Sequence, residues 1–388
     1  MLDPSDIEKI PKKIEKIMND TEHKIMEDII RRIKINSEIT RSADWQIQRL
    51  IEMGTSKEFI QKTIQEALSL SDDEIGAMYL KAFESEYVRN KRLYEALGLE
   101  QIPFAENKEL QQLIKSIIEQ TKDEMVNLTQ SMGFAVDMGA GKIIFTPLAT
   151  YYQNILDNNI NGIITGAFDY QSALKRTVTE MTNSGIRTVD YASGWSNRIN
   201  VAARRAIVTG IGQITGKVNE MNANELGTDV FEVSWHATAR PTHQVWQGKV
   251  YTMEELHSVC GLGTVDGLCG ANCYHSYSPF VEGVSERTYT DEQLAEMNRK
   301  ENTPQTYNDK QYTAHEATQR MRTLETRMRA QREKIKLLES GGADEETVNA
   351  IKTRYRMTSH EYTKFAETME LPQERQRVYI DNLRRVVK

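Results

Sequence analysis

The sequence predicts a mainly α-helical protein that carries one small α+β module. Three observations support this fold class. Isoleucines recur at helical spacing near the N-terminus, one short segment alternates apolar and polar residues, and two heptad-like seams occupy the C-terminal quarter. The chain has 388 residues, which is enough for two or three domains with their own cores. We therefore expect a helical N-terminal half, a Cys/His-containing β module and a C-terminal antiparallel helical hairpin.

Residues 1–132 are expected to form a helical N-terminal domain. Isoleucines three, four or eight residues apart stripe one face of a long first helix, and they are Ile7, Ile10, Ile14, Ile17, Ile25, Ile29 and Ile33. Later helix starts are predicted at Thr55 and at Ser71, because a glutamate three residues further on completes the spacing of a capping box. Gly54 is expected to end the helix before the first of these starts.

Residues 133–227 are expected to form a helical middle region. Glycines interrupt its first part, and a helical pattern returns from about 170 to 224. Gly194, Gly210, Gly212 and Gly216 each weaken this part by roughly 1 kcal/mol relative to alanine. Close packing of another element against these small residues would explain their presence.

Residues 228–288 are expected to form the small β-containing module. Apolar and polar residues alternate from 231 to 235, which predicts a half-buried strand. A second short strand is predicted at 249–251, and Thr252 with Glu255 has the spacing of a capping box for a following helix.

Residues 289–312 are rich in Asn, Gln and Thr, so we expect a linker, with Thr290 and Gln293 as the start of a short helix. Residues 313–388 are expected to form a helical hairpin and a basic tail helix, with the glycines at 341–342 between the two long helices. The first seam consists of Ala317, Met321, Leu324, Met328, Gln331, Ile335 and Leu338. The second seam consists of Val348, Ile351, Tyr355, Thr358, Tyr362, Phe365 and Met369.

The module concentrates the thiol and imidazole groups of the chain. All three cysteines and four of the seven histidines lie between 236 and 275. Because three cysteines cannot all pair with one another, the pattern favours reduced thiols or a metal site over a disulfide framework. The candidate ligands are His243, His257, Cys260, Cys269, Cys273 and His275. A tetrahedral zinc ion would stabilise an element with few apolar residues, and the alternative is that these side chains are buried without a metal.

An enzymatic role has less support in the sequence. The chain contains no His-Glu-x-x-His, Gly-x-Ser-x-Gly or Gly-x4-Gly-Lys-Ser/Thr motif. Cys273 near His275 leaves a thiol nucleophile open. A nuclease would need a basic face around the module, where Arg240 and Lys249 are nearly the only cations. We therefore expect a protein that is not an enzyme.

The chain is acidic overall, with a formal net charge of −7, but one predicted helix is basic. Between 320 and 336 seven cations oppose Glu325 and Glu333, which gives this window a net charge of +5. Such a helix can lie along DNA phosphates or meet an acidic protein surface, and the alternative is a solvated flank of the hairpin. The seven candidate residues are Arg320, Arg322, Arg327, Arg329, Arg332, Lys334 and Lys336, and Arg375, Arg377, Arg384, Arg385 and Lys388 extend the basic character.

Several motifs occur in a fixed order along the chain. A Tyr191-x-Ser193-Gly194 turn leads into Ala202-Ala203-Arg204-Arg205, and WHATARPTHQVWQGKVY and GLCGANCYHSYSPFVEG follow before the Arg-rich hairpin. In this order and content the chain resembles the phage minor capsid protein family, which is related to the Mu F-like head-morphogenesis proteins of tailed phages. The positions that match the family pattern are Trp235, Arg240, His243, Gly248, Asn272, Cys273 and His275. The resemblance favours His243, Cys260, Cys273 and His275 as the metal ligands, with Cys269 as the substitute. The cofactor expected from these sulfur and nitrogen donors is a structural zinc ion.

The resemblance implies a non-enzymatic virion protein that acts in head assembly or genome delivery. It would be made in the host cytoplasm and reside in the capsid interior or at the portal vertex, in several copies per particle. The implied partners are the portal protein, other capsid proteins and double-stranded DNA without sequence preference. The alternative is a metal-dependent nuclease or hydrolase centred on the Cys/His module. The carrier of an exported effector is less favoured, because no extra globular domain is expected after the hairpin.

No membrane-spanning segment is expected either. No apolar run in the sequence approaches the roughly 20 residues that are needed to cross a bilayer. The N-terminus has neither a basic segment nor an apolar core, so secretion by the usual signal is not expected.

Overall fold

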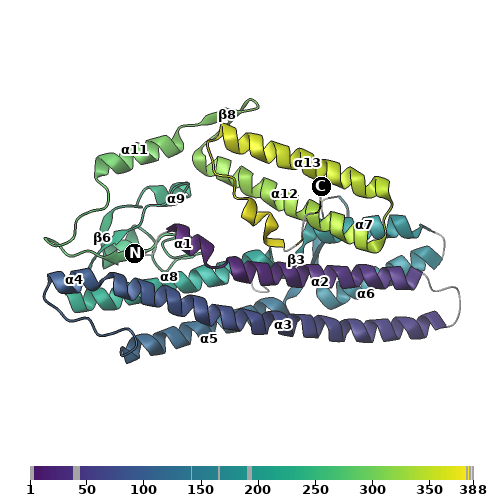
Figure 1. The fold of residues 1–388 in the computed structure, drawn as a ribbon, viewed down its shortest axis with the longest axis horizontal. Helices are drawn as coiled ribbons and strands as arrows, with labels where there is room; N and C mark the ends of the chain where they lie inside the picture. Colours follow the sequence, from purple (N-terminus) through teal and green to yellow (C-terminus); the bar gives the residue numbers. More distant parts are fainter. Residues whose placement is uncertain are drawn as a thin grey trace. The chain divides into compact units, whose positions relative to one another are not determined.

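Helices dominate the protein, and small antiparallel sheets accompany them (Figure 1). The structure is a computed structural model, and it describes residues 4–37, 44–140, 142–164, 167–189 and 195–381 together with Leu383 and Val386. The predicted fold class, mainly α with a small α+β part, is confirmed.

The chain divides into two compact units, each assembled from three separate stretches. The module unit consists of Met1–Ile14, Ser71–Met125 and Ala203–Gln319, and it contains the Cys/His module. The hairpin unit consists of Glu15–Leu70, Val126–Ala202 and Arg320–Lys388, and it contains the C-terminal hairpin.

The N-terminal third is helical, as predicted. Its helices are α1 (Pro4–Lys9), α2 (Lys12–Ser37), α3 (Asp44–Arg89), α4 (Lys91–Ala96) and α5 (Lys108–Gln130). Five isoleucines of the predicted stripe, Ile7, Ile14, Ile25, Ile29 and Ile33, have at most 2% of their surface exposed. Pro11, which has no N–H to donate, lies between α1 and α2 and separates what the sequence indicated as one helix.

The helix starts predicted at Thr55 and Ser71 are wrong, because α3 runs without interruption through both positions and through Gly54. The Thr55 hydroxyl accepts a hydrogen bond from Arg32 Nη1 at 2.8 Å, and Ser71 is fully buried. A single glycine costs only about 1 kcal/mol in a helix interior, which packing over a helix of this length offsets. At these two positions the Ser/Thr-x-x-Glu spacing therefore lies inside a helix and does not mark a helix start.

A four-stranded antiparallel sheet lies in the hairpin unit, and the sequence did not predict it. Its strands are β1 (Met132–Asp137), β2 (Ile143–Pro147), β3 (Ile186–Val189) and β4 (Ser196–Arg198), in the order β2-β1-β3-β4. Gly133 in β1 pairs with Pro147, and a Cβ atom at Gly133 would lie 2.3 Å from the Thr146 carbonyl oxygen. The glycine that suggested a broken helix is therefore required for close strand pairing.

Helices α6 (Leu148–Ile164) and α7 (Tyr170–Ser184) pack against β1. The Tyr151 ring of α6 lies 4.2 Å from the Phe134 ring of β1, and both side chains are buried. The predicted turn Tyr191-x-Ser193-Gly194 lies outside the described residues.

Helix α8 (Ile199–Leu226) shows the close packing predicted for its glycines. A Cβ atom would lie 2.2 Å from the Tyr79 hydroxyl oxygen at Gly210, 3.1 Å from Cys269 Cβ at Gly212, and 2.6 Å from the Tyr277 hydroxyl oxygen at Gly216. Helix α3 and the Cys/His module therefore approach α8 more closely than larger residues would allow.

The Cys/His module follows α8 and is built on a three-stranded antiparallel sheet of order β6-β5-β7. Its elements are β5 (Val230–Val233), α9 (Pro241–Gln244), β6 (Val250–Thr252), α10 (Met253–Ser258) and β7 (Tyr277–Pro279). The two predicted strands are confirmed, and so is the capping box of Thr252 and Glu255 at the start of α10. Strand β7 was not predicted, because its three residues are too few to show an alternating pattern.

The segment expected as a linker at 289–312 contains regular structure. Helix α11 (Asp291–Asn302) begins with the predicted capping box of Thr290 and Gln293. Strands β8 (Gln305–Tyr307) and β9 (Lys310–Tyr312) then form a hairpin, and both turn residues, Asn308 and Asp309, have positive φ angles of 46° and 61°. Asn and Asp tolerate this conformation, so the polar residues that indicated a linker build a tight turn.

The predicted C-terminal helical hairpin is confirmed, and Figure 1 shows α12 (Ala314–Gly341) beside α13 (Glu345–Thr368). Every residue of the two predicted seams is buried except Gln331, which is half-buried and bonds to Thr358 at 3.1 Å. The Tyr362 hydroxyl donates to Glu325 at 3.0 Å. This contact and the Gln331–Thr358 contact show that the two helices run antiparallel. The expected tail helix is replaced by two 3-10 turns, Arg375–Arg377 and Tyr379–Asp381, and Arg384, Arg385 and Lys388 lie outside the described residues.

Glu22 of α2 is a buried charged group in the hairpin unit. It is 4% exposed and accepts a hydrogen bond from the Ile186 N–H at 2.7 Å. Burial, and secondly repulsion by Glu333, raises the pKa of Glu22 to about 7, although Arg198 and Arg329 oppose this shift. The folded protein therefore favours the protonated form of this carboxyl group.

In the described ranges, no helix combines the length with the apolar composition that crossing a membrane requires.

Truncation of the hairpin seam is expected to destabilise the protein strongly. Met328 in α12 is fully buried, so Met328→Ala should lower the free energy of unfolding by about 2–5 kcal/mol. Met357 in α13 is 67% exposed, and Met357→Ala should change it by no more than about 0.5 kcal/mol. Chemical denaturation of both variants measures the difference, and equal effects would contradict the buried seam.

Replacement of Glu22 is expected to change how stability depends on pH. Because the pKa of Glu22 is higher in the folded than in the unfolded chain, its contribution is fully present below its ordinary pKa and is lost as the pH rises through about 7. Glu22→Gln should therefore gain stability relative to the wild type between pH 5 and pH 8, on the order of 2 kcal/mol. Denaturation at both pH values tests this, with Glu27→Gln, at an exposed position of the same helix, as the control. A pH-independent difference would contradict it.

Candidate functional site

The Cys/His module positions its functional side chains from three segments around the central strand β5. Helix α9 carries His243, the chain after α10 carries the three cysteines, and His275 lies just before β7. Gly248 has a φ angle of 74° and turns the chain from α9 into β6. The backbone N–H of Ser234 donates to the Ser276 carbonyl at 2.9 Å, and the Ser276 N–H donates to the Ser234 hydroxyl at 3.0 Å. These bonds hold the His275 segment beside the end of β5.

A compact apolar core lies under this site. It consists of Ala223, Phe231, Val233, Trp246, Leu256, Cys260, Leu268, Cys273 and Tyr277. The Phe231 and Tyr277 rings meet edge to face with centroids 5.4 Å apart. Helices α8 and α10, strands β5 and β7 and the cysteine-bearing loop therefore share one core.

The loop from 259 to 276 is held by tight turns. The Leu268 N–H donates to the Cys260 carbonyl at 2.9 Å. A Cβ atom at Gly267 would lie 2.0 Å from the Gly261 carbonyl oxygen, and one at Gly270 would lie 2.4 Å from the carbonyl oxygen of Val265. The glycines allow the loop to fold back on itself, and this brings Cys273 to the histidines.

Three predicted ligands converge at this point. His243, Cys273 and His275 each offer one ligand atom, and these atoms lie within 4.8 Å of one another; we call these residues the His-Cys-His cluster. The two Nδ1 atoms are 3.4 Å apart, and Cys273 Sγ lies 3.8 Å from His243 Nδ1 and 3.5 Å from His275 Nδ1. The three side chains are only 2%, 4% and 3% exposed.

The outer nitrogens of both rings are bound to oxygen acceptors. His243 Nε2 lies 2.9 Å from the Asp266 carbonyl oxygen, and His275 Nε2 lies 2.8 Å from Gln247 Oε1. Burial lowers the pKa of His243 and lowers that of His275 well below its usual range. Both rings are therefore neutral near pH 7. Gln247 lies four residues after His243, but α9 is too short for a helical pattern to have identified it.

The other candidate ligands lie apart from the cluster. Cys260 is 1% exposed in the apolar core, where burial raises the pKa of its thiol to about 12. Cys269 Sγ contacts the His275 carbonyl oxygen at 3.7 Å, and burial raises the pKa of Cys269 well above its usual value. His257 is exposed, and its Nδ1 lies 3.0 Å from the Leu262 carbonyl oxygen. The structure thus brings together three of the four favoured ligands but neither Cys260 nor its substitute Cys269.

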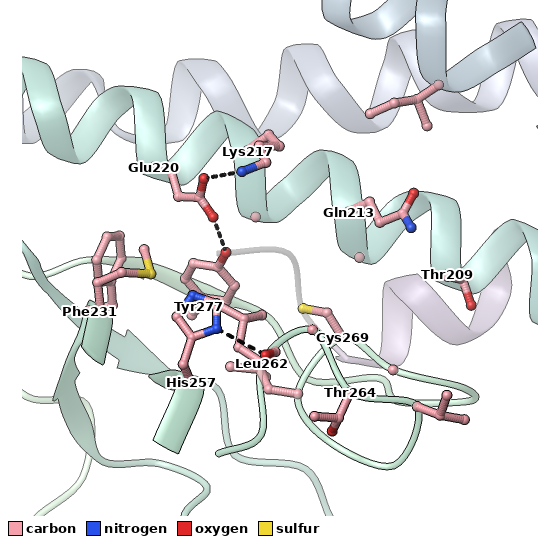
Figure 2. Close-up of a pocket in the computed structure, with 18 of the residues that line it drawn as sticks. Thr209, Gln213, Lys217, Glu220, Phe231, His257, Leu262, Thr264, Cys269 and Tyr277 are labelled. Atoms are coloured by element: carbon pink, nitrogen blue, oxygen red, sulfur yellow. Dashed lines mark hydrogen bonds and ion pairs between the residues drawn. The ribbon is translucent and has the colours of Figure 1, made fainter. Parts of the chain in front are cut away.

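A hollow of about 1000 Å³ lies between the module loop, α5 and α8, all within the module unit. Figure 2 shows Glu220 of α8 bonded to Lys217 at 2.6 Å and accepting a hydrogen bond from the Tyr277 hydroxyl at 3.0 Å. Cys269 lines this hollow from the loop side. Its walls combine apolar side chains with charged ones, which include the carboxylates of Glu220 and Asp229 and the cations Arg205 and Lys217.

The seven cations predicted as a basic face mostly contact groups of the hairpin unit itself. Ion pairs join Arg320 to Glu361, Arg322 to Glu374 and Glu325, and Lys336 to Glu339. Lys334 donates a hydrogen bond to the Thr179 hydroxyl. Arg332 is 2% exposed, and its Nε and Nη2 atoms bond to the Asp381 carboxylate at 2.6 and 3.0 Å. Arg329 is partly buried, and burial lowers the pKa of its guanidinium. Arg327 is the exposed member of the seven.

These contacts change what the net charge of +5 in this window can do. A charge that is paired inside the hairpin no longer attracts a distant phosphate as strongly as a solvated charge does. The structure also differs from the solvated flank weighed from the sequence, because six of the seven side chains are buried or half-buried.

Comparisons with known proteins agree with the resemblance seen in the sequence. The family model described as phage minor capsid protein 2 matches residues 2–367. A protein named "Structural protein" from Lactococcus phage LL-H is 26% identical over 289 residues, which cover 69% of this chain and 74% of that protein. No solved structure matches the chain. Because the family match spans nearly the whole sequence, the chain belongs to the phage minor capsid protein 2 family.

Proposed function

We propose that this phage structural protein acts without enzymatic turnover, bound near the portal of a tailed phage, in head assembly or genome delivery. The observation that carries the proposal is the family match over residues 2–367, which includes the Cys/His module and almost all of the hairpin. The similarity to a structural protein of another phage supports the same role. The protein is made in the host cytoplasm and enters the capsid interior or portal vertex in several copies.

The burial of the His-Cys-His cluster favours this role over a metal-dependent nuclease or hydrolase. A hydrolytic metal site needs an open position that water and the scissile bond can reach. Here the three ligand side chains are at most 4% exposed, and the Trp246 ring lies 4.5 Å from the His243 ring and 4.9 Å from the His275 ring. The nearby Arg240 bonds to the Ala271 carbonyl at 2.7 Å. The cluster is therefore better suited to holding the module together than to binding a substrate.

The surface of the module supports contact with another protein. Val245, Val259 and Val265 are 66%, 54% and 68% exposed, although the surrounding core buries larger apolar residues completely. Apolar side chains that remain exposed on a small, rigid element gain free energy when a partner covers them. The partners we propose are the portal protein and other capsid proteins.

DNA contact is a second, smaller part of the proposal. Arg327 is exposed on α12, where a duplex packed beside the hairpin can contact it. Because most of the other cations of the window are paired or buried, we expect weak binding without sequence preference.

Purified virions are expected to contain the protein at low copy number, and cross-linking within particles should join it to the portal protein. Mass spectrometry of density-purified particles measures both outcomes, with a non-structural protein of the same phage as the control for contamination. If the protein is missing from virions, the virion role is wrong. If it is present but cross-links only to capsid proteins away from the portal, the portal assignment is wrong.

The salt dependence of DNA binding should reveal how many cations take part. Seven solvated cations would give a slope of about −6 in a plot of log affinity against log salt concentration, because each neutralised phosphate contributes about −0.9. With Arg327 as the exposed cation, Arg327→Gln should make the measured slope shallower by about 0.9. Lys336→Gln, at a cation paired with Glu339 at 3.6 Å, serves as the control and should leave the slope unchanged. A slope near −6, or an unchanged slope for Arg327→Gln, would contradict this assignment.

A further inference from the structure

We propose that His243 Nδ1, His275 Nδ1 and Cys273 Sγ bind one zinc ion, which fastens the cysteine-bearing loop to α9 and to the segment before β7. This inference goes beyond the proposed function and does not depend on it. It is based on the geometry of the three ligand atoms, on the protons of the two rings and on the groups that surround them.

The spacing of the three ligand atoms fits the edges of a tetrahedron around zinc. Bonds of about 2.0–2.1 Å to nitrogen and about 2.3 Å to sulfur, at tetrahedral angles, separate two nitrogens by about 3.4 Å and a nitrogen from a sulfur by about 3.6 Å. The observed separations are 3.4 Å between the two nitrogens and 3.5 and 3.8 Å from each nitrogen to the sulfur. The side chains are therefore already arranged around a point that one small cation can occupy.

Each of the two imidazole rings carries its proton on Nε2, so the Nδ1 atoms that face each other carry no proton. The Asp266 carbonyl oxygen and Gln247 Oε1 are acceptors, so each Nε2 donates its proton outward, at 2.9 and 2.8 Å. In a neutral imidazole, Nδ1 then carries a lone pair, and two such lone pairs face each other across 3.4 Å. The single S–H of Cys273 can donate to only one of them. A cation satisfies all three ligand atoms at once, which removes the cost of a buried acceptor without a partner.

The groups that bind the two histidine rings are those usually found around the histidine ligands of a metal. Histidine ligands usually donate their second ring N–H to a carbonyl or carboxylate, which fixes the tautomer and the ring orientation. Gln247 Oε1 also accepts from the His236 N–H at 3.0 Å, so its amide is itself held in place. Sulfur and imidazole donors favour zinc over magnesium or calcium, which prefer oxygen ligands.

The fourth corner of the tetrahedron falls to an oxygen donor. Among the described residues, no further His, Cys, Asp or Glu joins the cluster. Asn272, the residue before Cys273, has a buried side-chain oxygen without a hydrogen-bond partner in the described part of the chain. This buried oxygen, which belongs to the residue next to Cys273, is the candidate for the fourth position.

Metal content and cobalt spectroscopy test the site on the full-length protein without a histidine tag. Elemental analysis should find one zinc per chain, and exchange for Co²⁺ should produce the visible bands of tetrahedral cobalt together with a thiolate-to-cobalt charge-transfer band. Cys273→Ala should abolish the charge-transfer band. Cys260→Ala and Cys269→Ala, which alter the two cysteines outside the cluster, are the matched controls and should retain it.

A variant outside the ligand set keeps the test valid if Cys273→Ala does not fold. Gln247→Ala leaves all three ligands in place but removes the acceptor of the His275 ring, so zinc affinity in competition with a chelator should fall by about 10–100-fold. Folded wild-type protein that takes up neither zinc nor cobalt would overturn the proposal. So would a charge-transfer band that survives in Cys273→Ala, a band that is lost in Cys269→Ala, or an unchanged affinity in Gln247→Ala.

Discussion

The position of the Cys/His module depends on its close contact with α8. Gly216 leaves room for the Tyr277 ring, whose hydroxyl oxygen would lie 2.6 Å from a Cβ atom at that position. One turn further along, the fully buried Asn219 side chain donates to the Tyr277 carbonyl at 2.6 Å and to Glu86 at 3.1 Å, and accepts from Asn90 at 3.1 Å. Because each of these buried polar groups needs a partner, their hydrogen bonds favour one arrangement of α3, α8 and β7 over others. The small sheet is thereby held on the long helices.

In the hairpin unit, charged side chains are likewise paired within the unit itself. A basic window in an acidic protein suggests an external anion, yet Glu361, Glu374 and Asp381 of the same unit supply the opposite charges. Arg332 bonds to both oxygens of Asp381 and stacks on Tyr379 at 4.8 Å, so the tail is attached to the hairpin by a buried pair. Such a pair contributes little net stability but strongly disfavours other positions of the tail, since separating it leaves a buried charge alone. The arginines of this window therefore act mainly in packing the tail and the hairpin together.

Sequence reasoning succeeded where a pattern repeats over many residues, and it failed where structure depends on distant partners. The seams of α12 and α13 were predictable because each spans seven positions of a heptad pattern, and nearly all of these positions are buried. Strands β1 to β4 have three to six residues each, so no period could emerge, and the pairing of β1 with β3 joins segments that lie about fifty residues apart. Cys273 and His275 were favoured as ligands, together with His243 and Cys260, by the resemblance to the family. Spacing alone cannot separate a candidate ligand such as Cys273 from a thiol of the apolar core such as Cys260.

The free cysteines and the small apolar content of the loop from 259 to 276 explain why a metal ion suits this loop better than a disulfide does. The three cysteines are free thiols in the structure, and disulfides are rare in compartments that keep thiols reduced. The loop from 259 to 276 contributes few large apolar side chains to the core, so burial alone yields little free energy to oppose the entropy of ordering it. One metal ion joins α9, the loop and the chain entering β7 at a single point, and its binding free energy becomes folding free energy for all three segments. A zinc ion suits such a link, because zinc has no redox chemistry of its own and the three ligand side chains are at most 4% exposed.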